Sequence, residues 1–134
     1  MTAKKLMIGD WVRHANGTAM QVTRIDYTND GGHFACGTPH CWEYNNKFEP
    51  IPLTEEILKA NGYEEVVGEK GMFGATIAPY FKRDDSPRVY CDGNPFAVWF
   101  DDPVDIKYVH QLQHVLRLCG VENEIKLKEM LKQE

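Results

Sequence analysis

The densest set of chemically active side chains lies within nine residues of the N-terminal half: His33, Cys36, His40 and Cys41. Thiolate and imidazole are the donors that a tetrahedral zinc site uses. The adjacent residues His40 and Cys41 converge poorly on one ion, and the paired Cys-x-x-Cys spacing is missing. We therefore predict ordinary turn and sheet residues here and no bound metal, with a zinc site as the alternative.

Two histidines, His110 and His114, lie four residues apart, a spacing at which two side chains of one helix can hold a metal ion. Helical periodicity places them opposite an apolar stripe that includes Tyr108, Leu112 and Leu116. We therefore expect both imidazoles to lie in solvent, and we predict no metal site because no third ligand is nearby.

Three aspartates, Asp101, Asp102 and Asp105, could bind a hard cation or serve as an acid and a base. Pro103 favours a turn between them, and Asp105 stands where a helix cap belongs. The sequence therefore predicts a turn and a cap here.

The glycine-rich stretch 68–74 resembles a phosphate-binding loop only superficially. It lacks the Gly-Lys-Ser/Thr ending, and a strand instead of a helix is expected after it. We interpret it as a mobile loop.

No nucleophile elbow, zincin helix or Rossmann fingerprint occurs in the sequence. We therefore predict no catalytic residues and no cofactor. Because catalytic groups can converge from distant parts of a chain, a small enzyme that uses the acidic or His/Cys clusters stays an alternative.

The first fifty residues read as β structure. Segments 9–14 and 19–25 flank Asn16-Gly17, a pair that accepts the backbone of a tight hairpin. The alternation of apolar residues changes face along the second segment, which predicts a β-bulge near Thr23. Further short strands are expected at 33–36 and 41–44.

The rest of the chain alternates helix and strand signals. Thr54 can cap a short helix that Gly62 closes. A three-stranded antiparallel meander is then expected at 75–82, 88–91 and 96–100, followed by a helix from Asp105 to Cys119. Residues 121–134 fit either a short helix or a tail.

These elements predict an α+β fold in one domain, residues 1–134, with possible subdomains at 1–52 and 53–120. Three motifs, Ile8–Val12, Ile51–Tyr63 and Tyr108–Gln113, resemble a family of small uncharacterised proteins of gut-bacterial genomes, prophages and mobile elements. The resemblance implies an association with mobile DNA and nothing about mechanism. Separately, Gly9-Asp10-Trp11-Val12 followed by a hairpin resembles the opening of an SH3-like, partly open barrel.

Charge and composition narrow the partner classes. The net charge is −5, with five Lys/Arg and four Asp/Glu in residues 1–48 and ten and sixteen in the remainder. Neither part clusters the cations that a nucleic-acid surface needs, so a nucleic-acid accessory protein is only an alternative. No signal peptide or membrane-spanning run occurs, so we expect a cytoplasmic protein with four free thiols.

Our leading hypothesis is a non-enzymatic interaction or assembly module that contacts a protein partner or a second copy. Its support is the aromatic content of the β half, because aromatic side chains anchor interfaces disproportionately. The predicted partner-binding residues are Trp42, Trp11, Tyr27 and Tyr44. Trp42 ranks first because it follows the irregular segment 37–41.

We predict that the protein binds no stoichiometric zinc and that all four thiols react with a thiol reagent after unfolding without reductant. The reasons are the adjacency of His40 and Cys41 and the missing export signal. Metal analysis by mass spectrometry and thiol titration check this, and one zinc ion per chain would contradict it.

Overall fold

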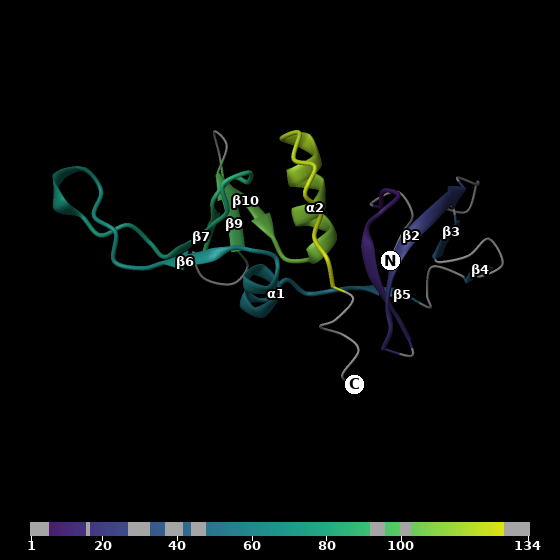
Figure 1. The fold of residues 1–134 in the computed structure, drawn as a ribbon. Coiled ribbons are helices and arrows are strands. Elements are labelled where there is room, and N and C mark those ends of the chain that lie inside the picture. The colour runs from purple at the N-terminus through teal and green to yellow at the C-terminus, as the bar shows by residue number, and fades with distance from the viewer. Residues whose placement is uncertain are drawn as a thin grey trace.

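The computed structural model describes residues 6–15, 17–26, 33–36, 42–43, 48–91, 96–99 and 103–127. Within these residues the chain forms two five-stranded antiparallel sheets and two α-helices, which confirms the α+β class (Figure 1). No described helix is long and apolar enough to cross a membrane.

The first sheet has the strand order β4-β3-β2-β1-β5. The predicted hairpin is confirmed, because the amide of His14 donates to the carbonyl of Thr18 (2.9 Å) and Gly17 takes a φ of 92°. The predicted bulge is also confirmed by a register shift between Val22 and Arg24. The strands are β1 (Trp11–His14), β2 (Ala19–Asp26), β3 (His33–Cys36), β4 (Trp42–Glu43) and β5 (Phe48–Pro50).

The second sheet is a meander in which each strand pairs with the next along the chain. Three of its strands were expected, although the first begins only at Tyr80, and the structure adds one strand at each edge. The strands are β6 (Glu64–Val66), β7 (Tyr80–Lys82), β8 (Val89–Tyr90), β9 (Phe96–Trp99) and β10 (Pro103–Ile106).

Helix α1 (Glu55–Ala60) is capped as predicted, since the amide of Ile57 donates to Thr54 Oγ1 (3.3 Å). Helix α2 (Val109–Leu118) begins later than expected, and its N-cap is Tyr108. The predicted cap at Asp105 is wrong, because that residue pairs with Ala97 within β10.

The physical reason for the late start of α2 lies in Ile106. Its side chain is buried and its backbone pairs with Phe96, so the chain remains in β10 up to Ile106 and the helix can begin only after it. The side chain of Gln111 then accepts hydrogen bonds from the amides of Lys107 (2.8 Å) and Tyr108 (3.0 Å), as a helix start requires.

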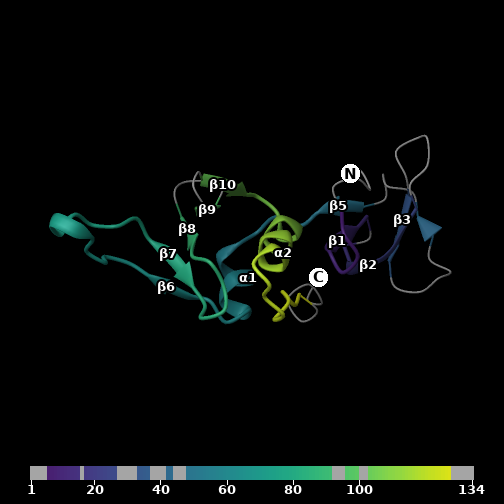
Figure 2. The same cartoon turned by 90° about the horizontal axis from the view of Figure 1, so that it is seen from above.

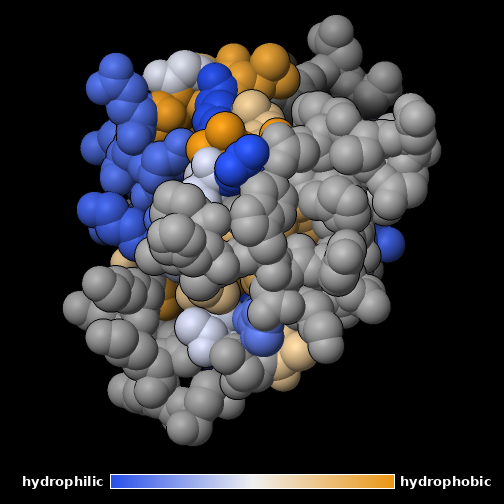
Figure 3. Space-filling model, turned by 90° about the vertical axis from the view of Figure 1, so that its right-hand side faces the viewer, coloured by the Kyte–Doolittle hydropathy of each residue, from blue (hydrophilic) through white to orange (hydrophobic). Residues whose placement is uncertain are grey.

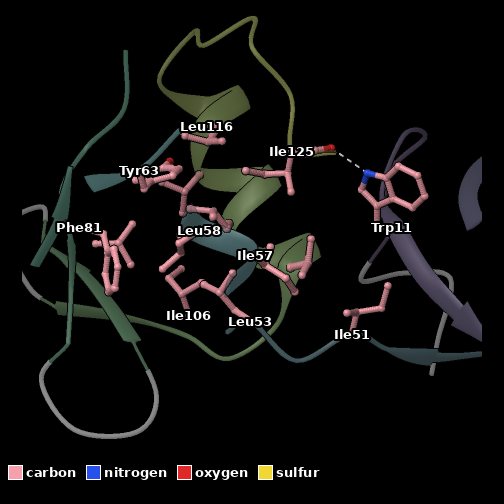
Figure 4. Packing of buried hydrophobic residues seen from close by; sticks show 14 of the residues in the cluster. Trp11, Ile51, Leu53, Ile57, Leu58, Tyr63, Phe81, Ile106, Leu116 and Ile125 are labelled. Atoms are coloured by element: carbon pink, nitrogen blue, oxygen red, sulfur yellow. Dashed lines mark hydrogen bonds between the residues drawn. The ribbon is translucent and has the colours of Figure 1, made fainter. Parts of the chain in front are cut away.

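Both helices pack on one face of the second sheet and form the larger of two apolar clusters (Figures 1, 2 and 4). Leu112 and Leu116 of α2 are buried, as predicted, whereas Tyr108 is only half-buried. The smaller cluster lies in the first sheet and comprises Leu6, Val12, Val22, Phe34, Cys36 and Phe48.

An extended segment after α2, residues 121–127, crosses the larger cluster, and we call it the strap. Ile125 and Leu127 are buried, and Asn61 exchanges two side-chain hydrogen bonds with the backbone of Lys126 (3.1 and 2.7 Å). The choice between helix and tail is thereby answered for 121–127, while 128–134 lie outside the described residues.

We predict that Leu112→Ala lowers the free energy of unfolding by about 2 to 5 kcal/mol, because it removes a fully buried leucine from the larger cluster. Leu118→Ala is the matched control on the same helix, since Leu118 is 79% exposed, and its effect should stay within about 0.5 kcal/mol. Urea unfolding of both variants measures the difference, and equal losses would mean that the faces of α2 are assigned wrongly.

Candidate functional site

One residue of the predicted aromatic interface, Trp11, is buried in the structure. Trp11 is only 8% exposed and belongs to the larger cluster, and its indole Nε1 donates to the carbonyl of Ile125 in the strap (2.8 Å; Figure 4). The expectation that Trp11 faces a partner is therefore corrected. The strap that buries it is distant in sequence, so strand periodicity alone could not reveal the contact.

The remaining aromatic candidates stay predictions. Trp42 lies in β4, opposite Ala35 of β3, but its side chain is outside the described part, as are Tyr27 and Tyr44. Figure 3 views the molecule from the side of the first sheet, where the described apolar atoms gather along the upper edge.

The structure describes only part of the alternative zinc site. Cys36 is buried as a free thiol in the smaller cluster, His33 lies in β3, and His40 and Cys41 fall outside the described residues. Cys91 and Cys119 are also free thiols, as expected. Among the described residues, no three potential ligands gather as a metal site would require.

A buried polar network joins the first sheet to α2, and we call it the junction. Its centre is Asp10, whose carboxylate is fully buried. It accepts hydrogen bonds from the amide of Met7 (2.7 Å), from His114 Nε2 (2.6 Å) and from Arg117 Nη1 (2.6 Å). A buried carboxylate needs such partners to remain charged.

The amide of Gln113, also fully buried, completes the junction. Its Oε1 accepts from the backbone of Trp11 (2.9 Å), and its Nε2 donates to the carbonyl of Gly9 (2.9 Å). Partial burial lowers the pKa of Arg117, but hydrogen bonds to Asp10 and Glu124 outweigh this and raise it above the ordinary value. The guanidinium therefore stays charged and holds Asp10 in place.

The prediction that His110 and His114 are a solvated pair is wrong. His110 is 6% exposed, its ring stacks on Tyr108 (5.9 Å) and meets His114 edge-on (5.6 Å), and His114 binds Asp10. The residues preceding β1 cover this face of α2, so the helix is packed on two sides. His110→Ala should therefore be costly, contrary to the sequence-based expectation. The polar groups of the junction bind one another, which favours a structural role.

The structure describes only one of the three acidic candidates. Asp105 is exposed on the edge strand β10, and Asp101 and Asp102 lie outside the described residues. A polar cavity of about 460 Å³ lies elsewhere, beside β7 and the strap. Its most buried cation, Arg83, is already bound to the carbonyls of Asn61 and Asn123. The Arg83 guanidinium is therefore not free to bind a ligand in this cavity.

The stretch expected as a loop is instead a paired hairpin, residues 67–79, which we call the arm. Within it the amide of Ile77 donates to the carbonyl of Glu69 (2.8 Å), and the amide of Gly71 donates to that of Ala75 (2.7 Å). Lys70 Nζ also donates to Thr76 Oγ1 (2.8 Å). Figures 1 and 2 show the arm projecting from the second sheet, away from the rest of the molecule.

The tip of the arm carries two apolar side chains in solvent. Phe73 is 100% exposed and Met72 is 81% exposed. Phe73 also has a φ of 63°, which makes it the one non-glycine residue with positive φ in the described part of the chain. That backbone conformation suits glycine and costs another residue about 1 to 2 kcal/mol.

The sequence signal for this site was the pair Met72-Phe73 between Gly71 and Gly74. This signal is weak, because glycine-rich loops are common and one apolar pair has no periodicity. Comparison with protein-family models, with curated proteins and with solved structures finds no match, so geometry alone distinguishes the candidates.

For the junction, we predict that Arg117→Ala lowers the free energy of unfolding by about 3 to 5 kcal/mol, because it removes the ion-pair partner of a buried carboxylate. Arg13→Ala is the control: its ion pair with Glu49 is exposed, so its loss should cost less than about 1 kcal/mol. Chemical denaturation measures both values, and a small loss in Arg117→Ala would contradict the structural role of the junction.

Proposed function

We propose that this protein is a non-enzymatic interaction module that engages a protein partner by inserting the tip of the arm, Met72 and Phe73, into an apolar pocket. The observation that carries the proposal is the fully exposed, positive-φ Phe73. Residues held in strained backbone conformations cluster at functional sites.

The energetics of the tip support a binding role. At position 73 glycine would relieve the backbone, and the aromatic ring contributes no buried area to the fold. Burying a Phe side chain in a partner gains about 1.5 to 3 kcal/mol, which exceeds or matches the strain. Phe73 thus weakens the isolated chain and strengthens a complex.

The order within the arm supports the same role. Three hydrogen bonds join its two sides, so the tip is presented in a defined conformation before a partner arrives. Binding through a preorganised element loses less conformational entropy than binding through a flexible loop.

The two alternatives have less support. An enzyme would use the acidic or His/Cys clusters, but of their described members Cys36 is buried in the smaller cluster and Asp105 is exposed on the edge strand β10. A nucleic-acid accessory protein would need clustered cations, whereas the chain has a net charge of −5 and the arm contains one Lys and one Glu.

The motif resemblance extends the proposal to an assembly module encoded by a mobile element. The strand order of the first sheet, in which β5 returns beside β1, is compatible with a partly open, SH3-like barrel. Trp42 remains a second proposed anchor, at the far end of the molecule from the arm.

We predict that Phe73→Gly keeps or raises the free energy of unfolding, by up to about 1 kcal/mol, because it relieves the backbone. The same variant should lose about 2 kcal/mol of partner binding, or roughly thirtyfold in affinity. Leu118→Ala, which removes another exposed apolar side chain, from α2, should retain binding.

The measurement is thermal unfolding together with quantitative capture from the lysate of the source organism by immobilised wild-type and variant protein. Equal capture by wild type and Phe73→Gly would remove the tip from the interface. A large loss of stability in Phe73→Gly would instead return Phe73 to a structural role.

A further inference from the structure

The pairing of the arm is interrupted at its base. Strands β6 and β7 pair as far as Val66 and Tyr80, and pairing resumes where Ile77 donates to Glu69. Among the described residues, no backbone hydrogen bond joins 67–68 to 78–79 across this gap. Gly68 takes a φ of 78°, and Pro79 has no amide hydrogen, so neither residue favours a regular ladder.

One side-chain contact spans the gap. The hydroxyl of Tyr80, in the sheet, donates a hydrogen bond to the carboxylate of Glu69, in the arm. Glu69 is also the residue whose carbonyl accepts from Ile77, so the bond attaches the first backbone pair of the arm to β7.

The Tyr80 ring is itself held in place. It is 3% exposed, the guanidinium of Arg88 lies 4.3 Å from its centroid, and the ring of Tyr90 lies 5.4 Å away. Cations over aromatic rings and tilted aromatic pairs are both favourable contacts. The hydroxyl therefore points at Glu69 from a fixed position.

We infer that Tyr80 is a positioning residue whose bond to Glu69 fixes the direction of the arm across a break in its backbone pairing. Without this bond the arm pivots at 67–68 and 78–79, and the backbone pair next to the pivot, Ile77 to Glu69, opens more often while the bond from Gly71 to Ala75 persists. The consequence for binding rests on the proposed function, because a pivoting arm presents Phe73 to a partner in many directions.

The test replaces Tyr80 with Phe, which keeps the ring and its packing and removes only the hydroxyl. We expect the backbone amide of Ile77 to exchange with solvent about tenfold faster, and the NMR order parameters at Met72 and Phe73 to fall. Tyr63→Phe is the matched control, since it removes a hydroxyl bonded to Ser86 (2.6 Å) outside the arm, and it should leave these signals unchanged.

Two variants of Glu69 make the test independent of the tyrosine. Glu69→Gln keeps an oxygen acceptor and should retain slow exchange at Ile77, whereas Glu69→Ala should reproduce Tyr80→Phe. Unchanged exchange and order in both Tyr80→Phe and Glu69→Ala would overturn the inference. Increased arm motion with undiminished partner capture would uphold the positioning role and contradict the proposed function instead.

Discussion

The buried carboxylate of Asp10 is the constraint on which the arrangement of the two sheets depends. A charge without solvent is tolerated only where hydrogen-bond donors surround it. Its donors come from its own turn and from α2, more than a hundred residues later in the chain. The segment before β1 and one face of α2 must therefore meet in a single register.

That register determines what else is buried. Gln113 binds the backbone on either side of Asp10, which brings Trp11 against the larger cluster, where the strap accepts its indole hydrogen bond. The most polar face of α2 thus becomes an internal surface. Residues that looked available for chemistry or binding, His114 and Trp11 among them, are used to join the two sheets.

The tip of the arm, unlike the polar residues of the junction, makes no contact in the described structure that would explain its composition. It lies at the end of the molecule remote from the first sheet (Figure 1). Phe73 retains a strained backbone and full exposure, while Tyr80 and Glu69 hold the base of the arm. Together these features favour a rigid element that is completed by a partner.

Local signals predicted the structure well where adjacent residues decide it. Asn16-Gly17 predicted the hairpin, a change of apolar face predicted the bulge at Thr23, and Thr54 predicted the start of α1. The sequence-based predictions were wrong where contacts between residues distant in the chain decide the structure. Asp105 has the side chain of a cap but pairs with β9, and His110 occupies a polar helix position but is only 6% exposed. The sequence does not predict the arm because a hairpin held by one isolated bridge, Lys70 to Thr76, carries no periodic pattern.

The central claim is that the tip of the arm is a contact surface for a protein. Its most direct test is site-specific photo-crosslinking in cells of the source organism, with a photoreactive phenylalanine analogue at position 73 and, as the control, at position 118, which is also exposed. The account predicts one discrete protein adduct from position 73 and none of that mass from position 118. The same adducts from both positions, or adducts of position 73 with nucleic acid alone, would contradict it.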